Sequence, residues 1–252
     1  MNQPQHKNFT ALVTGGSRGI GRAISLRLAA TCAQAVIVNY LQNDVEAERT
    51  SKLIEEENSS CILARANLLY PHEIDGLFEK VKETAGHLDV FIHCAALGAF
   101  KPLMDIKPNQ WDLTVNINAR AFLLCVQKCV PLMKNEGKIV AISSLGSLRV
   151  VPNYGALGPT KAALESIVRY LAVELAPLGI QVNAVTGGFI GTDSMKKFPD
   201  ADMLMREISA RTPAKRVGTP DDIADVVMFL ISSSARWIYG QSIVVDGGLS
   251  IL

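Results

Sequence analysis

The sequence predicts an α/β fold: a single doubly wound domain, residues 1–252, in which a seven-stranded parallel sheet carries helices on both faces. Short apolar runs rich in β-branched residues alternate with longer segments of helical periodicity along the whole chain. No linker or change in composition interrupts this alternation, so one domain is expected. Right-handed strand–helix–strand connections then place the strands in one parallel sheet.

The apolar runs predict strands whose carboxyl ends lie along one edge of the sheet. Ligands of open parallel sheets bind beyond that edge, so the strand ends should line one crevice. The expected strands are residues 9–14, 35–40, 61–66, 88–93, 138–142, 180–185 and 242–245.

Helical periodicity predicts helices between these strands. Gly86 suits a helix C-terminus, and Pro220 suits the first turn of the helix that follows it. The stretch at about 190–215 has a broken pattern with Pro199 and Pro213, which predicts a mobile substrate lid or, alternatively, a surface helix. The expected helices pass through residues 24–28 and span 45–57, 74–85, 111–133, 153–175 and 221–230.

Composition and charge exclude several classes of protein. The net charge is +1, whereas a nucleic-acid-binding protein would carry a strongly basic face. No apolar run reaches the roughly 18 residues of a membrane-spanning helix, and the polar N-terminus does not resemble a secretory signal. We therefore expect a cytoplasmic protein with no nucleic-acid, membrane or metal partner. The five cysteines, Cys32, Cys61, Cys94, Cys125 and Cys129, lack zinc spacing and are expected to be reduced; Cys125 and Cys129 fit buried apolar positions better than a metal or redox pair.

A glycine-rich turn joins the first strand to the first helix at residues 15–21, Gly-Gly-Ser-Arg-Gly-Ile-Gly. Glycines let the backbone turn sharply and approach a pyrophosphate closely. The helix that follows offers unpaired N–H groups to the phosphate charge. We expect a dinucleotide to bind here; an ordinary tight turn is the alternative.

The end of the second strand predicts which dinucleotide binds. An acidic residue at that point would bind the ribose 2′-hydroxyl of NAD. This chain has Asn39 and Tyr40 there, and Arg18 stands in the glycine turn. A cation without a carboxylate favours the 2′-phosphate of NADP, unless Arg18 is a surface arginine with no ligand.

A serine, a tyrosine and a lysine are candidate catalytic residues. Ser143 and Ser144 lie at the carboxyl end of the fifth strand, and Tyr154 precedes Lys161 by seven residues. On one helix that spacing puts the phenol and the ammonium on the same face, roughly 10 Å apart along the axis. The cation is expected to lower the pKa of the phenol, which suits a proton donor.

Two further polar residues invite a functional interpretation. His93 ends the fourth strand, where it is either a catalytic or metal-binding group or, as expected here, a histidine hydrogen-bonded in place. The small residues after it, Cys94 and Ala95, suit close passage of a ligand. Asn116 lies in the middle of an expected helix, so it needs a polar partner or a function.

Together these motifs resemble the short-chain dehydrogenase/reductase family over residues 9–252. The resemblance implies a seven-stranded Rossmann sheet, usually assembled as a homotetramer. Its markers are Thr14-Gly15-x3-Gly19-x-Gly21, Asn116, Ser144, Tyr154, Lys161 and Val182-Asn183-Ala184-Val185.

The tyrosine spacing departs from most of that family, which places tyrosine four residues before the lysine, where this chain has Leu157. The spacing of Tyr154 and Lys161 resembles that of the enoyl-acyl-carrier-protein reductases, in particular the shorter NADPH-dependent type. A shift of three helical residues would move the phenol by roughly 4.5 Å. That displacement suits a donor to the enolate oxygen of a thioester, which lies two carbons from the carbon that receives hydride.

The resemblance implies NADPH-dependent reduction of a trans-2-enoyl thioester carried on acyl carrier protein. Tyr154 would donate to the enolate oxygen, Lys161 would bind the nicotinamide ribose, and Ser144 would orient the substrate or support the cofactor. The implied cofactor-binding residues are Gly15, Ser17, Arg18, Gly19 and Ile20 at the diphosphate, Asn39 and Tyr40 at the second strand, Asn67 and Leu68 beside the adenine, Cys94, Ala95, Asn116 and Lys161, and Ile190 and Thr192 at the nicotinamide carboxamide and phosphates.

Other departures keep alternatives open. The family's Asn-Asn-Ala-Gly is replaced by residues 93–96, His-Cys-Ala-Ala, which leaves a specialised substrate open, and its Pro-Gly by Gly187-Gly188. The alternatives are a 3-oxoacyl thioester ketoreductase or other short-chain alcohol dehydrogenase, and a non-catalytic nucleotide-binding protein. Lys196, Lys197, Arg206 and Arg211 form either a docking site for an acidic carrier protein or a plain solvated surface.

Overall fold

The structure, a computed structural model, describes residues 9–31, 33–193, 195 and 200–252. Seven strands form one sheet in the order β3-β2-β1-β4-β5-β6-β7, and every neighbouring pair is parallel. This confirms the predicted fold class. The strands are β1 (Thr10–Thr14), β2 (Ala35–Tyr40), β3 (Ser60–Arg65), β4 (Leu88–His93), β5 (Met133–Ser144), β6 (Gln181–Gly187) and β7 (Ser242–Val245).

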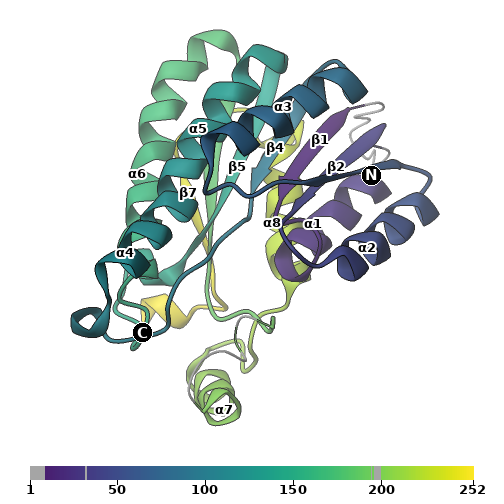
Figure 1. Cartoon of the computed structure of the whole chain (residues 1–252). Helices are drawn as coiled ribbons and strands as arrows, with labels where there is room; N and C mark the ends of the chain where they lie inside the picture. The colour runs from purple at the N-terminus through teal and green to yellow at the C-terminus, as the bar shows by residue number, and fades with distance from the viewer. Residues whose placement is uncertain (1–8, 32, 194, 196–199) are drawn as a thin grey trace.

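Helices cover both faces of the sheet (Figure 1). On one face lie α3 (Pro71–Ala85), α5 (Ala121–Cys129) and α6 (Leu157–Leu175). On the other lie α1 (Gly19–Ala30), α2 (Asp44–Glu56) and α8 (Pro220–Ile231). None of the helices in the described residues is long and apolar enough to cross a membrane.

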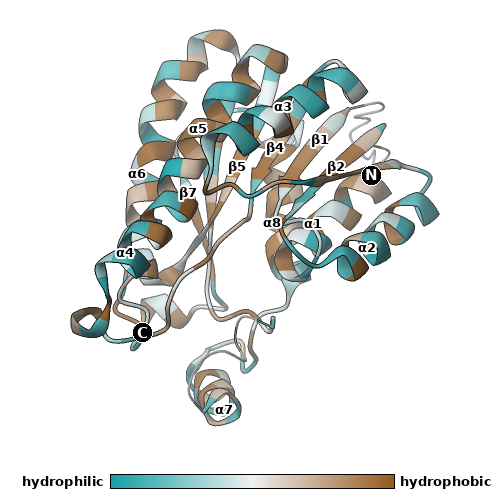
Figure 2. Cartoon of the chain, viewed as in Figure 1, coloured by the Kyte–Doolittle hydropathy of each residue, from teal (hydrophilic) through white to brown (hydrophobic). Residues whose placement is uncertain are grey.

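Each face of the sheet carries its own apolar core because side chains alternate along a strand. In β1, Leu12 points into the core beside Phe122 of α5, while Ala11 and Val13 point into the core beside Ile24 of α1. Figure 2 shows the strands mostly in the hydrophobic colour, whereas the helices carry both colours. Of the cysteines, Cys125 and Cys129 are buried in the first core, and Cys32 lies outside the described residues.

The strand order reverses between β1 and β4. From β1 the chain moves outward through β2 to β3, then returns to the other side of β1 and continues from β4 to β7. Thr14 is in register with both Asn39 and His93, so three strand ends meet at this reversal. Such a switch point is where open α/β sheets bind ligands.

The long helix expected over residues 111–133 is interrupted. It begins earlier, as α4 (Pro108–Val115), passes through a π-helical turn at Asn116–Arg120, and continues as α5. The side chain of Gln110 accepts a hydrogen bond from the backbone N–H of Lys107, at 3.2 Å, and Pro108 suits the first turn. The π turn inserts a residue into the helical repeat, which periodicity alone does not reveal.

The stretch expected to form a lid contains α7 (Ala201–Arg211), which lies apart from the sheet and its helices in Figure 1. Ile208 is its buried residue, and Met203 is exposed. Pro199, Lys196 and Lys197 lie outside the described residues.

A capping box fixes the start of α8. The Asp222 side chain accepts a hydrogen bond from the backbone N–H of Thr219 at 2.7 Å, and Thr219 caps the helix in return. Arg216 donates to both carboxylate oxygens and, as the main cause, holds the pKa of Asp222 well below its usual range. Thr219→Ala should lower the free energy of unfolding by about 1 kcal/mol in urea denaturation, whereas Thr219→Ser should leave it nearly unchanged. Equal losses in both variants would contradict the capping role.

Candidate active site

A cavity of about 920 Å³ lies beyond the carboxyl ends of the strands, at the reversal of the sheet. The structure brings together in its lining every predicted site residue except Asn116. Asn116 begins the π turn, and its neighbour Ile117 reaches the cavity instead. The predicted residues in the lining are Gly15, Ser17, Arg18, Gly19, Ile20, Asn39, Tyr40, Asn67, Leu68, Cys94, Ala95, Ser144, Tyr154, Lys161, Ile190 and Thr192.

The glycine turn is shaped for close approach to a ligand. Gly15 has φ +63°, and a Cβ there would lie 3.0 Å from the Cα of Ala95. A Cβ on Gly21 would lie 2.2 Å from the carbonyl oxygen of Gly15, so α1 rests directly on the turn. Helix α1 has no side-chain cap and no acidic residue in its first turn, which leaves its first N–H groups for an anion. These features fit the pyrophosphate of a dinucleotide.

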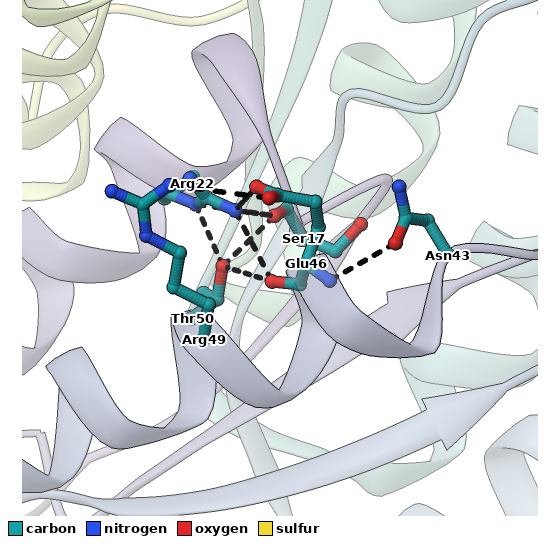
Figure 3. Close-up of polar contacts among 6 residues, drawn as sticks. All are labelled: Ser17, Arg22, Asn43, Glu46, Arg49 and Thr50. Atoms are coloured by element: carbon teal, nitrogen blue, oxygen red, sulfur yellow. Dashed lines mark hydrogen bonds and ion pairs between the residues drawn. The ribbon is translucent and has the colours of Figure 1, made fainter.

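An arginine holds the turn from outside, as Figure 3 shows. Arg22 donates from Nε and Nη2 to the carbonyl oxygen of Ser17, at 3.1 and 2.6 Å. Thr50 of α2 donates to the same oxygen at 2.8 Å, and Arg22 forms an ion pair with Glu46. Asn43 caps α2 by accepting from the backbone N–H of Glu46 at 3.0 Å. We did not predict this cluster, because its members are far apart in the sequence.

The end of β2 presents no acidic side chain of its own. Asn39 is buried and donates to the carbonyl oxygens of Ala64 and Ala66, at 3.1 and 3.2 Å, so it ties β2 to β3. The hydroxyl of Tyr40 donates to Asp44 at 2.9 Å. Asp44 also lines the cavity, and Arg18 is exposed at its mouth.

Tyr154 does not lie on α6, which corrects the helix expected over residues 153–175. Asn153 has φ +61°, and Tyr154 forms an extended bridge with Lys101 before α6 begins at Leu157. A Cβ on Gly146 would lie 2.6 Å from the Tyr154 ring, so the ring rests on that glycine. The position of the phenol is therefore set by the contact of its ring with Gly146. The expected displacement by three residues along one helix does not apply, because Tyr154 precedes α6.

Leu157 fills the position four residues before Lys161. It is 4% exposed, and a Cβ on Gly98 would lie 2.5 Å from its Cγ. The ring of Phe100, two residues beyond Gly98, lies 5.9 Å from the Tyr154 ring, centroid to centroid. The segment after β4 thus packs against Leu157 and Tyr154. This packing helps to fix the position of the Tyr154 phenol in the site.

Burial governs the protonation of the two candidate catalytic groups. Burial raises the pKa of Tyr154, and the hydrogen bond with Ser144 opposes that rise. The pKa of the phenol is therefore raised overall and not lowered, which corrects the expectation from the sequence. Lys161 donates to the carbonyl oxygen of Ile142 at 2.8 Å, and burial lowers its pKa to about 8, against the raising effects of Cys94 and Glu165.

A buried carboxylate, Glu165, was missed by sequence reasoning. Its Oε1 accepts hydrogen bonds from Ser143 at 2.5 Å, Ser147 at 2.6 Å and Thr186 at 2.9 Å. The available signal was an acidic residue one helical turn after Lys161 on the apolar side of its helix.

Two other polar residues have structural partners. The Nδ1 of His93 lies 3.2 Å from the hydroxyl of Thr14, so this histidine is hydrogen-bonded in place, and burial lowers its pKa to about 3. Asn118, rather than Asn116, is the buried asparagine of the π turn. It accepts from the N–H of Leu97 at 3.1 Å and donates to the carbonyl oxygen of Leu97 at 2.8 Å.

Comparison with known proteins identifies the family of this chain. A family model described as enoyl-(acyl carrier protein) reductase matches residues 15–250. The chain belongs to the short-chain dehydrogenase/reductase family. It is 44% identical to 1-cyclohexenylcarbonyl-CoA reductase of Streptomyces collinus, over 100% of this chain and 92% of that protein. It is 35% identical to 3-oxoacyl-[acyl-carrier-protein] reductase FabG of Staphylococcus epidermidis, over 96% of this chain and 99% of that protein.

Solved structures place this short-chain reductase among oxidoreductases of the same fold. The angucycline C-6 ketoreductase LanV with bound NADP has a TM-score of 0.90 at 32% identity, covering 98% of this chain and 100% of that one. A short-chain dehydrogenase of Burkholderia cenocepacia in complex with NADP has a TM-score of 0.91 at 32% identity, covering 99% and 100%.

The charge of Lys161 should set the alkaline limit of this short-chain reductase. Because its pKa lies at about 8, the ammonium is lost as the pH rises through that value. We expect kcat/KM for the nicotinamide cofactor, which reports the free enzyme, to fall above about pH 8. A profile that stays flat well above this pH would contradict a role for the charged form.

Proposed function

We propose that this protein uses NADPH to reduce the conjugated double bond of a trans-2-enoyl thioester. The observation that carries the proposal is the phenol position. Tyr154 stands ahead of α6, held by Gly146 and Phe100, while Leu157 fills the helical position closer to Lys161. A donor placed in this way suits an oxygen that lies away from the carbon receiving hydride.

The residues of the site divide the work between them. NADPH, when bound, would supply the hydride to C3 of the acyl chain, and uptake of a proton from water at C2 would complete the reduction. Tyr154 donates a hydrogen bond to the thioester oxygen, on which negative charge develops, and Ser144 orients the phenol. Lys161, whose ammonium donates to the carbonyl oxygen of Ile142, would hold the nicotinamide ribose. The glycine turn and the open end of α1 bind the pyrophosphate.

Two comparisons support an enoyl substrate. The matching family model is described as an enoyl reductase. The Streptomyces collinus relative is named for 1-cyclohexenylcarbonyl-CoA, a thioester whose ring double bond is conjugated with the carbonyl.

Reduction of a 3-oxoacyl thioester is the second candidate. The FabG relatives and the solved ketoreductases are named for keto reduction, and they favour it. Hydride reaches C3 in this reaction too, but the negative charge develops on the C3 oxygen. Tyr154 would then have to donate to the oxygen bonded to C3, the carbon that receives hydride, and not to the thioester oxygen. The two candidate reactions therefore differ in where the donor must stand.

NADPH, an acyl carrier protein and a homotetramer complete the proposal. Arg18 at the mouth and the absence of an acid at the end of β2 favour the 2′-phosphate, and two structural neighbours hold NADP. Arg206 and Arg211 on α7 would face an acidic carrier, although Arg211 also pairs with Glu207 at 3.5 Å. The α7 region would act as the lid of a single NADP-binding domain.

The test follows NADPH oxidation by absorbance with crotonyl and longer enoyl thioesters, beside acetoacetyl thioester. Each acyl group is supplied on coenzyme A and on acyl carrier protein, and NADH is the cofactor control. Turnover of the enoyl substrates supports the proposal. Turnover of acetoacetyl thioester alone would replace it with keto reduction, and NADPH binding without turnover of either would indicate a non-catalytic protein.

A further inference from the structure

Glu165 joins three parts of the active-site wall through one buried oxygen. It lies one turn after Lys161 on α6 and is 5% exposed. Its three hydroxyl donors come from different elements: Ser143 from the end of β5, Ser147 from the 3-10 turn at Leu145–Ser147, and Thr186 from the end of β6. Donation by three hydroxyls to one oxygen suits an ionised carboxylate.

We propose that Glu165 is a positioning residue of this enzyme, which fixes the segment supporting Tyr154 and supplies the negative charge that balances the buried ammonium of Lys161. The inference rests on the proposed roles of Tyr154 and Lys161. Its two parts, position and charge, depend on separate observations.

The positioning part follows from where the hydroxyl donors lie in the chain. Ser143 and Ser147 flank the residues that touch the phenol, which are Ser144, its hydrogen-bond partner, and Gly146, against which its ring packs. Holding both ends of this short segment on one carboxylate fixes the surface on which Tyr154 rests. Thr186 extends the same anchor to β6, which pairs with β5 in parallel.

The charge part follows from the groups around Lys161. Its neighbours are the Ile142 carbonyl, Cys94 and His93 on the β4 side, and Glu165 on its own helix. His93 is neutral because burial lowers its pKa to about 3. The Cys94 thiol is neutral because burial raises its pKa to about 11.

Tyr154 stays protonated as well, since burial raises its pKa. Among these neighbours, Glu165 is the one carboxylic acid, and its effect is to raise the pKa of Lys161. It follows Lys161 by one turn of α6. An opposite charge nearby favours the ammonium, against the cost of burying it.

The first test is Glu165→Gln, which keeps the shape and removes the charge. Its matched control is Glu174→Gln, the same change at an exposed position of the same helix. The Lys161 ammonium is titrated by NMR of ¹³C-labelled lysine, assigned with Lys161→Arg, and kcat is measured across pH. Glu165→Gln should move the Lys161 titration at least about one pH unit lower and reduce kcat roughly tenfold or more. The control should match the wild type in both.

A Lys161 titration in Glu165→Gln that matches the wild type would overturn the charge part. This readout needs neither cofactor nor substrate, so it remains informative if the wild type reduces no thioester, which would instead contradict the proposed function. The positioning part is tested separately by Ser147→Ala, which removes one donor and keeps the charge. It should lower kcat severalfold and leave the Lys161 titration in place. An unchanged kcat would overturn positioning, even if Glu165→Gln failed to fold.

Discussion

Tyr154→Phe should reduce kcat for enoyl thioesters by about two to three orders of magnitude, the usual loss when one donor to a developing oxyanion is removed. The ring would keep its contacts with Gly146 and Phe100, so the fold of the site should survive. The dissociation constant for NADPH should change by less than about twofold, because the change removes one interaction made in the transition state. Steady-state kinetics and NADPH fluorescence titration measure the two quantities.

Tyr170→Phe is the matched control, because it removes a hydroxyl from a tyrosine that is 70% exposed on α6. It should behave as the wild type. A Tyr154→Phe enzyme that kept more than about a tenth of wild-type kcat would show that the phenol is not the donor. Selective loss with acetoacetyl thioester would instead assign Tyr154 to keto reduction.

Gly21→Ala should weaken dinucleotide binding severely, raising the dissociation constant for NADPH by at least about a hundredfold. The added Cβ would lie 2.2 Å from the carbonyl oxygen of Gly15 and 3.0 Å from the Cα of Gly16, both backbone atoms. The start of α1 must then move away from the glycine turn, and the N–H groups of its first turn no longer point toward the pyrophosphate. Fluorescence titration with NADPH and thermal unfolding measure the effect.

Gly76→Ala provides the control for the same substitution. Gly76 lies in α3 with nothing within 4 Å of an added Cβ, so this variant should bind NADPH normally. It should also be more stable by up to about 1 kcal/mol, because alanine favours a helix interior. Wild-type affinity in Gly21→Ala would contradict the described packing of turn and helix.

Local signals account for what could be predicted from the sequence. The strands are short apolar runs, and the glycine turn lies between a strand and a helix, so both fold class and cavity follow from neighbours in the chain. The parallel sheet then brings Ser144 and Cys94 to one edge without further information.

The parts that escaped prediction depend on tertiary contacts or on unusual backbone. Helical periodicity continues back past Leu157. Asparagine tolerates the left-handed conformation, so Pro152 and Asn153 were a weak local turn signal, but the periodicity outweighed it, and Tyr154 in fact lies off the helix. The π turn at Asn116–Arg120 shifts the register so that Asn118, and not Asn116, is buried. Glu165 reads as an ordinary helical acid because its hydroxyl partners lie 18 to 22 residues away in the chain.

The cluster in Figure 3 bears on the speed of cofactor binding. Arg22 and Thr50 donate hydrogen bonds to the Ser17 carbonyl oxygen, so the backbone of the turn is fixed by contacts within the protein. A loop that is already ordered gives up little conformational entropy when a ligand arrives, whereas a loop that must order on binding loses roughly 1–2 kcal/mol per residue. Association with the dinucleotide should therefore occur in a single bimolecular phase, with a rate that rises linearly with cofactor concentration.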